Sequence, residues 1–237
     1  MEDTTIWRYL DFTKFLDLIS SRLVFFCRSD QLGDPFEGSF PRERVERQIA
    51  EIRQHDEEFE NELRLYETAG IEFRKYVFVN CWHMSDCESS ALWRLYLKSD
   101  EGVAIRSTRN RLGAAFANSK PGVWQVPIWY IDYNTDDPPV PTRWAPFRYK
   151  RKSFAHEKEL RAIVYADVQD EQGNILPPPG EKGIRLDADL DRLIEAVYVA
   201  PTAPDWFREL TVRVCRKFEV RAEVIPSSLV TDKPVFL

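Results

Sequence analysis

The stretch Phe154-Ala155-His156-Glu157-Lys158-Glu159-Leu160-Arg161-Ala162-Ile163-Val164-Tyr165 decides how this chain is interpreted. Its second half is apolar and partly β-branched, which favours a strand in a half-buried sheet. In a strand that begins near Glu157, alternation places Glu157, Glu159 and Arg161 on one face and buries Leu160 on the other, together with Val164. The pattern therefore predicts a paired-carboxylate face opposite an apolar face.

This paired-carboxylate face has two interpretations. Side chains two residues apart on one strand face lie about 7 Å apart, so Glu157 and Glu159 can act on a single substrate. Arg161, one step further, can keep both carboxylates ionised or hold an anion beside them. The alternative is an edge strand whose alternating charges are solvated.

Composition indicates a globular protein with a bulky core. The chain has 237 residues, 43% of them hydrophobic and 13% aromatic, including seven Trp, and such a length can bury a sizeable core. The net charge of −6 gives no general attraction to nucleic acid or to an acidic membrane surface.

Targeting signals are not expected in this sequence. Apolar runs stay below the roughly 20 residues that a membrane-spanning helix needs. The N-terminus reads Met-Glu-Asp-Thr-Thr, without the basic-then-apolar order of a signal peptide. We therefore expect a cytoplasmic protein without a membrane partner.

Periodicity predicts a mixture of strands and helices along the chain. Strands are expected at 7–10, 23–27, 76–82, 102–106, 125–131, 160–165, 197–199 and 220–225. Helices are expected at 11–19 with Asp11 as N-cap, 88–97, 108–118, 189–196 and 204–217, with a charged helical insertion at about 42–70. The segments 136–146 and 169–183 are Pro-rich loops. The prediction is one compact α+β domain over residues 1–237, with a mixed or antiparallel sheet, surrounding helices and long Pro-rich loops.

The segment Cys81-Trp82-His83-Met84-Ser85-Asp86-Cys87 contains three residue types that can ligate a metal. Structural zinc sites usually carry a second ligand pair, and this chain has no Cys-x-x-Cys. We predict that this segment holds neither a metal nor a disulfide.

Aromatic and basic residues offer a second set of candidate binding groups. Trp93 and Tyr96 lie three apart on one predicted helix, so they can stack on a ligand ring or fill the core. The run Lys150-Arg151-Lys152 precedes the carboxylate strand. With Arg8 and Arg161 it can form an anion site, or it can be a solvated basic face. The common nucleotide, hydrolase and zinc-protease motifs are missing from the sequence.

Several separated motifs occur in order along most of the chain: Arg8-Tyr9-Leu10, Asp34-Pro35-Phe36-Glu37, Cys81-Trp82 with Trp93-x-x-Tyr96, Glu101-Gly102-Val103-Ala104-Ile105, Lys152-x-Phe154-x-His156-Glu157-x-Glu159-x-Arg161, and Tyr198-Val199-x-Pro201. Together they resemble a bacterial family known as domain of unknown function 2971, and this resemblance implies no established activity.

A more distant resemblance is to the mono-ADP-ribosyltransferase fold. Those enzymes carry an Arg or His on an early strand, a Ser or Tyr on a middle strand and Glu-x-Glu on a late strand. Arg8 matches the first position, and Glu157-Lys158-Glu159 the last. The middle position differs, because the strand at 76–82 ends Asn80-Cys81-Trp82. The resemblance implies that the Arg clamps a phosphate of NAD and that a Glu stabilises an oxocarbenium-like transition state.

The leading functional hypothesis is an NAD-consuming transferase or glycohydrolase with NAD as substrate and no bound cofactor. Glu159 would be the catalytic carboxylate, Glu157 its helper and Arg8 the phosphate anchor. Further substrate-binding candidates, for an anionic or nucleotide small molecule, are Tyr9, Trp93, Tyr96, Lys152 and Arg161. One alternative is another enzyme that uses the Glu pair as acid and base on a phosphorylated or glycosidic substrate. The other is a non-catalytic interaction module in stress response or phage defence.

Overall fold

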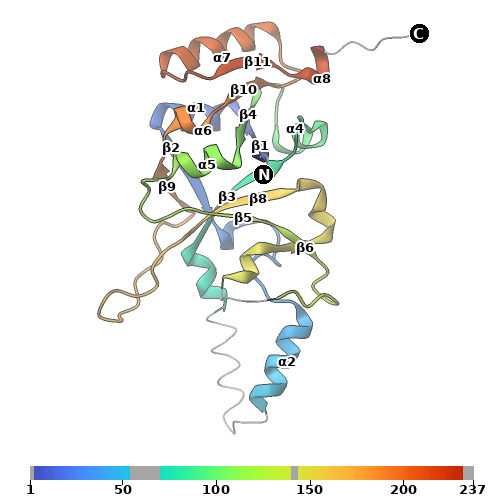
Figure 1. Ribbon diagram of the computed structural model, residues 1–237, viewed down its shortest axis with the longest axis vertical. Helices are drawn as coiled ribbons and strands as arrows, with labels where there is room; N and C mark the ends of the chain where they lie inside the picture. The colour runs from blue at the N-terminus through green and yellow to red at the C-terminus, as the bar shows by residue number, and fades with distance from the viewer. Residues whose placement is uncertain (1–2, 54–69, 140–143, 232–237) are drawn as a thin grey trace, which may run out of the picture.

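A computed structural model describes residues 3–53, 70–139 and 144–231 of the chain (Figure 1). Most strands form one large sheet, and helices pack against both of its faces. Its strands are β1 (Thr5–Asp11), β2 (Leu23–Arg28), β3 (Val77–Met84), β4 (Gly102–Thr108), β5 (Trp124–Pro127), β8 (Glu159–Tyr165), β9 (Gly183–Asp187), β10 (Ala196–Val199) and β11 (Glu223–Pro226). Two short strands, β6 (Trp129–Ile131) and β7 (Tyr149–Arg151), pair separately.

The large sheet has the order β11-β10-β4-β1-β3-β2-β9, and β8 and β5 branch from β3. Only β10 and β11 pair in parallel among its described pairs. Helices surround this sheet in one compact domain, so the predicted α+β class with a mixed sheet is confirmed.

The branch point at β3 splits the sheet. One edge of β3 pairs with β8 from Val77 to His83. The opposite edge is shared, because β2 pairs only with Phe78 and Val79 whereas β1 pairs only with His83 and Met84. Within the described residues, no strand therefore pairs with positions 80–82 on that edge. This opening between β1, β2 and β3 positions the candidate site.

Helices form at four of the predicted ranges, 11–19, 88–97, 108–118 and 204–217, whereas the helix predicted at 189–196 is confined to 190–193 because residues 196–199 join the sheet. The helices and 3₁₀ turns are α1 (Phe12–Ser21), α2 (Arg42–Arg53), α4 (Ser90–Tyr96), α5 (Arg109–Ala115), α6 (Leu190–Leu193), α7 (Asp205–Lys217), α8 (Ser228–Thr231), η1 (Ser29–Gln31), η2 (Arg74–Tyr76), η3 (Ala145–Arg148) and η4 (Lys152–Glu157). On α7, for example, Phe207, Thr211 and Cys215 recur every four residues and are buried, as an amphipathic helix requires.

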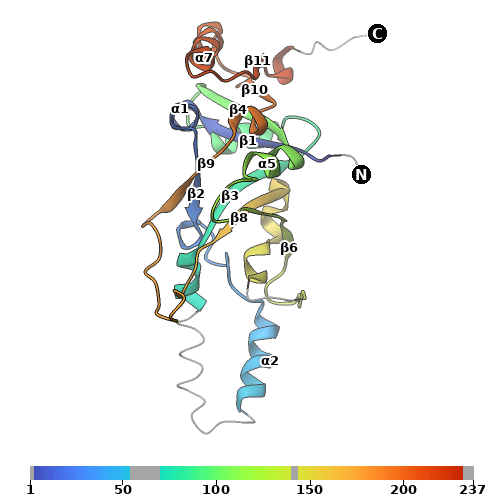
Figure 2. The ribbon, with the colours of Figure 1, turned by 60° about the vertical axis from the view of Figure 1, so that its left-hand side comes forward.

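The main core lies between the sheet and the helices α1, α5, α6 and α7. Phe15 of α1, Val24 of β2, Ile105 of β4 and Leu160 of β8 are all in it, and Phe207 of α7 completes this side. Figure 2 shows α1 packed beside β1 and β2. On the other face of the sheet, α4 packs its apolar side against β1 through a smaller cluster.

The stretch 154–165 contains β8, which is an internal strand of the sheet. Leu160 and Val164 are buried in the main core, whereas Ile163 faces a separate cluster on the other side, so the predicted alternation over 160–165 is confirmed. The edge-strand alternative is wrong, because β8 pairs with β3 and with β5, and Glu159 and Arg161 are buried.

The start of this strand differs from the prediction. Glu157 ends η4, and Lys158 adopts a left-handed conformation with φ of 41° before β8 begins at Glu159. A strand would have alternated through Lys158, but the left-handed residue turns the chain between the two carboxylates.

Several other expectations need correction. The strand β7 lies in what was predicted only as a basic run, and β9 begins at the last residue of the predicted loop at 169–183 and continues where no element was predicted. Both strands form because β6 and β2 supply partners far along the chain. The strand at 125–131 is broken at Ile128 into β5 and β6. Asp11 occupies the N-cap of α1 without a side-chain cap, because its Oδ1 accepts from Lys98 N at 3.2 Å. The insertion at 42–70 begins with α2, and residues 54–69 lie outside the described part.

Candidate functional site

Five charged residues form a buried ion cluster beside β3 and β8: Glu37, Lys150, Glu157, Glu159 and Arg161. The Nε atom of Arg161 donates to Glu159 Oε1 at 2.6 Å, and Lys150 Nζ donates to Glu159 Oε2 at 3.0 Å. Lys150 Nζ also donates to Glu157 Oε2 at 2.6 Å, while Arg161 Nη2 lies 2.6 Å from Glu37 Oε2. With three carboxylates and two cations, the fully ionised cluster carries one excess negative charge.

The cluster keeps Glu159 ionised. Burial alone would raise the pKa of this carboxyl, but Arg161 and Lys150 lower the pKa to about 2. Burial likewise opposes the charged form of Arg161, and Glu159 and Glu37 nevertheless raise its pKa well above the usual value. For Glu37 burial prevails, so its pKa is raised. Within the cluster Glu159 is therefore a permanent negative charge at neutral pH.

The loop Asp34-Pro35-Phe36-Glu37 closes one side of the cluster. Asp34 binds Arg151 through both oxygens, each at 3.0 Å, and this bidentate pair anchors the loop to β7. Such pairing fixes geometry more strongly than a single ion pair does. Glu37, only 3% exposed, is thereby held against Arg161.

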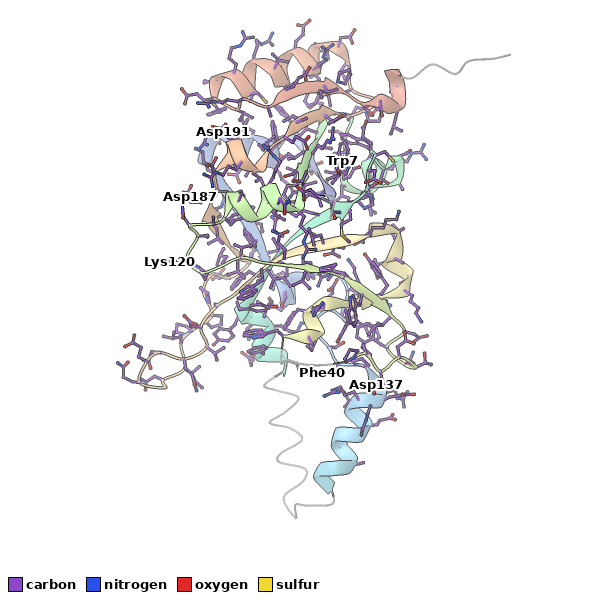
Figure 3. The ribbon with its side chains drawn as sticks, in the orientation of Figure 1. Trp7, Phe40, Lys120, Asp137, Asp187 and Asp191 are labelled. Atoms are coloured by element: carbon purple, nitrogen blue, oxygen red, sulfur yellow. The ribbon has the colours of Figure 1, made fainter. Side chains whose placement is uncertain are left out.

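A cavity of about 270 Å³ opens at the split in the sheet, and we call it the glutamate cavity. Glu157 and Glu159 contribute to its wall, as does Arg8 of β1. Aromatic residues from β1, β2, β3 and α4 complete much of the lining: Trp7, Tyr9, Phe25, Trp82 and Tyr96. Figure 3 shows Trp7 beside α4, and Trp7 belongs to the same buried cluster as Leu92 and Trp93 of that helix.

Arg8 lacks a counter-charge. Its Nη1 atom is buried without a hydrogen-bond partner in the described residues, and no described carboxylate lies within 4.0 Å of its guanidinium. Burial lowers the pKa of Arg8 to about 10, so the group is still protonated at neutral pH. Its nearest aromatic contact is Trp82, with 5.9 Å from Cζ to the ring centroid. A largely buried cation without a counter-charge is unfavourable for folding, and it fits a site that an anion completes.

His83 is a further polar group of the glutamate cavity. Its Nδ1 lies 2.6 Å from the carbonyl oxygen of Glu157. A carbonyl only accepts, so Nδ1 carries a proton and the neutral ring presents Nε2 as an acceptor. Burial lowers the pKa of His83, which keeps the ring neutral at physiological pH.

The structure brings together some of the predicted site residues and separates others. Arg8, Tyr9, Tyr96, Glu157 and Glu159 all line the glutamate cavity. Trp93 instead lies behind Tyr9: the two rings meet edge to face with centroids 4.9 Å apart, and Trp93 Nε1 donates to Glu88 at 2.9 Å.

The remaining two predicted residues lie elsewhere. Arg161 is fully buried and does not line the glutamate cavity. It can influence a ligand there only through Glu159, to which it donates a hydrogen bond. Lys152 has a side chain that is 61% exposed and pairs with Asp136 at 3.0 Å. In the basic run it is therefore Lys150, and not Lys152, that reaches the carboxylates.

Sequence reasoning missed three members of the site. Glu37 lies more than a hundred positions from Glu159 in sequence, in a motif that was named only for its family resemblance and not as part of the site. Lys150 was considered only within a basic run, although alternation in a short strand buries one of its cations. His83 was considered as a metal ligand alone, and its position at the end of β3, opposite Glu159 in the register, is the signal that could have identified it.

The cysteine segment shows no metal geometry in the part of the chain that the structure describes. No group of three or more His, Cys, Asp or Glu side chains is placed there to hold an ion. The four cysteines, at 27, 81, 87 and 215, are all free thiols. Burial raises the pKa of Cys81 well above its usual value, which makes it a poor nucleophile.

Comparison with protein-family models, with curated proteins and with solved structures gave no match. Among the described residues, no helix has the length and apolar character needed to cross a bilayer.

Proposed function

We propose that this protein cleaves the nicotinamide–ribose bond of NAD and transfers the ADP-ribose group to an acceptor or to water. The observation that carries the proposal is the glutamate cavity, in which the unpaired cation Arg8 and the ionised Glu159 line the same space. The dinucleotide brings a pyrophosphate for the cation and a cationic glycosyl centre for the carboxylate, so the two charges of the cavity are complementary to it.

The reaction requires an ionised carboxylate, and the buried ion cluster keeps Glu159 in that form. The C1′–N bond breaks, its electron pair leaves with nicotinamide, and positive charge develops on the ribose. A carboxylate with a pKa of about 2 stays charged throughout and stabilises that developing cation. The acceptor then attacks C1′ and gives up a proton, for which Nε2 of neutral His83 is an acceptor in the same cavity.

The same pKa argues against the acid–base alternative. A general acid at neutral pH needs a carboxyl whose pKa is raised toward 7, as in glycosidases. Glu159 is lowered to about 2, and Glu37, whose pKa is raised, contacts Arg161 and is not part of the cavity lining. The interaction-module alternative gives no reason for an unpaired arginine in a cavity.

The test is nicotinamide release from NAD, measured with and without cell extract as a source of acceptors. Wild type should release nicotinamide, and Glu159→Gln should lower the rate by a factor of about 10² to 10³, since the charge is lost at constant shape. Glu37→Gln is the matched control, because it also removes a cluster carboxylate but leaves Glu159 at the cavity wall.

Two outcomes would contradict the proposal. No release by wild type under either condition would exclude NAD as the substrate. Equal losses in Glu159→Gln and Glu37→Gln, with both proteins folded by circular dichroism, would mean that the cluster supports the fold and contributes no specific charge to catalysis.

A further inference from the structure

A second cavity lies on the other face of the sheet, under α1. This α1 cavity has a volume of about 280 Å³, and α1 and β2 supply much of its lining, including Leu18, Leu23 and Val24. Its exposed charged residues are Lys14, Asp17 and Arg185, of which Asp17 and Arg185 pair at 2.9 Å.

The two cavities meet at Arg8. Five residues line both of them: Arg8, Leu10, Lys14, Phe25 and Trp82. The cavities adjoin where one edge of β3 has no strand partner at positions 80–82 in the described sheet. This gap between β1, β2 and β3 connects the two faces of the sheet. Arg8, whose Nη1 atom is buried without a hydrogen-bond partner, is therefore shared by the two cavities.

Size favours one site over two. Small-molecule sites typically measure about 300 to 1,000 Å³. Each cavity is slightly below this range, and the two joined at Arg8 fall within it. A ligand that spans both must carry its anionic group in the middle, with a separate group on either side.

The chemistry of the two walls differs. The glutamate cavity presents Glu157 and Glu159, which suit a cationic ring and ribose hydroxyls. In the α1 cavity the buried lining is aliphatic and aromatic apart from Arg8, and its other charged residues are exposed. It therefore suits an uncharged ring whose apolar faces are buried and whose polar edge points outward, because an unpaired polar edge would be costly inside.

We propose that the two cavities form one dinucleotide site, with the pyrophosphate at Arg8, the nicotinamide riboside in the glutamate cavity and the adenine in the α1 cavity. This inference rests on the proposed function for the choice of dinucleotide. It adds a binding subsite on the opposite face of the sheet, formed by α1, β2 and Trp82. Specificity for the adenine half is then set by residues remote from the carboxylates.

The test uses calorimetric titration of the two halves of the ligand separately, AMP and nicotinamide mononucleotide. Leu18→Phe fills the α1 cavity from α1, and Leu23→Trp narrows it from a half-buried position, so it serves if the first variant does not fold. Both side chains line the α1 cavity and not the glutamate cavity. We expect either variant to weaken AMP binding by about tenfold or more through steric overlap, and to change nicotinamide mononucleotide binding by less than about twofold.

Other results overturn the inference. AMP affinity that is unchanged in both variants, or no AMP binding by wild type, would place the adenine elsewhere. Octanoate binding that is lost in the same variants while AMP binding persists would assign the α1 cavity to aliphatic acids. Failure of the proposed function has a different signature, because AMP would then bind and respond to Leu18→Phe while NAD released no nicotinamide.

Discussion

Arg161 holds Glu159 from two positions further along the same strand, with 2.6 Å between Nε and Oε1, while both side chains are almost fully buried. Removing one partner of such a pair leaves the other as an uncompensated buried charge. We therefore expect Glu159→Gln to lower the free energy of unfolding by about 3–5 kcal/mol.

Urea denaturation of Glu159→Gln and of Glu157→Gln measures this difference. Glu157 accepts from Lys150 alone among the cluster cations, so its loss should cost less, about 1.5–3 kcal/mol as for a hydrogen bond to a charged group. Equal effects of the two substitutions would show that Arg161 contributes nothing to holding Glu159.

Stability should depend on acid through Glu159. Its pKa is about 2 in the folded protein, against about 4.3 for an unfolded glutamate. The unfolded state therefore binds the proton first as the pH falls, so this contribution is present above about pH 4.3 and is lost toward pH 2. Between pH 5 and pH 3 the loss is about 1.5 kcal/mol.

Glu37 acts in the opposite direction, because its pKa is raised in the folded protein. Its contribution therefore grows as the pH falls and offsets part of the loss. Urea unfolding of wild type and Glu159→Gln across this pH range isolates the Glu159 term. The variant should show a flatter profile, and parallel profiles would mean that the pKa of Glu159 does not differ between the folded and unfolded states.

The left-handed turn at Lys158 gives a test that is independent of charge. Lys158 is exposed and has φ of 41°, a conformation that costs an L-residue about 1–2 kcal/mol. Lys158→Gly should hold or raise the melting temperature, whereas Lys158→Val should lower it, since a β-branched residue is least tolerant of this region. If valine proved as stable as glycine, the chain would not turn between Glu157 and Glu159.

Protonation of His83 should lower kcat/KM for NAD at acid pH. The pKa of His83 is lowered by burial, so its neutral form dominates above its usual pKa of about 6.5 and persists below it. We expect kcat/KM for NAD to fall on the acid side of pH 6.5 in wild type, and His83→Gln to lose that limb. An unchanged limb in the variant would assign the titration to another group.

The fold was largely predictable from local patterns, because apolar alternation and helical stripes depend on neighbouring residues. The alternation of Leu160 and Val164 against Glu159 is of this kind. Pairing between distant segments was not predictable, and β9 illustrates this: its residues 183–187 pair with β2 across more than 150 positions. No local pattern in a Pro-rich region signals that partner.

The site was predictable only in part, for a related reason. Arg8, Tyr9, Tyr96, Glu157 and Glu159 were expected at the site and do share the glutamate cavity. The groups that set the charge state of Glu159 depend on tertiary contacts instead, through a loop and a short strand. Glu37 and Lys150 could therefore be recognised only once the fold had placed them around Arg161 and Glu159.

Arg8→Met tests the central claim most directly, with Arg161→Met as the contrasting buried arginine. The melting temperature of each variant and of wild type is measured with and without ADP-ribose. Arg8 has no carboxylate partner among the described residues and its Nη1 atom has no hydrogen-bond partner, so Arg8→Met should melt at or above the wild-type temperature. It should also lose the ligand-induced rise that wild type shows. Arg161→Met should melt well below wild type, because it leaves Glu159 and Glu37 uncompensated. An Arg8→Met protein that melts lower than wild type and keeps the full ADP-ribose shift would contradict the account.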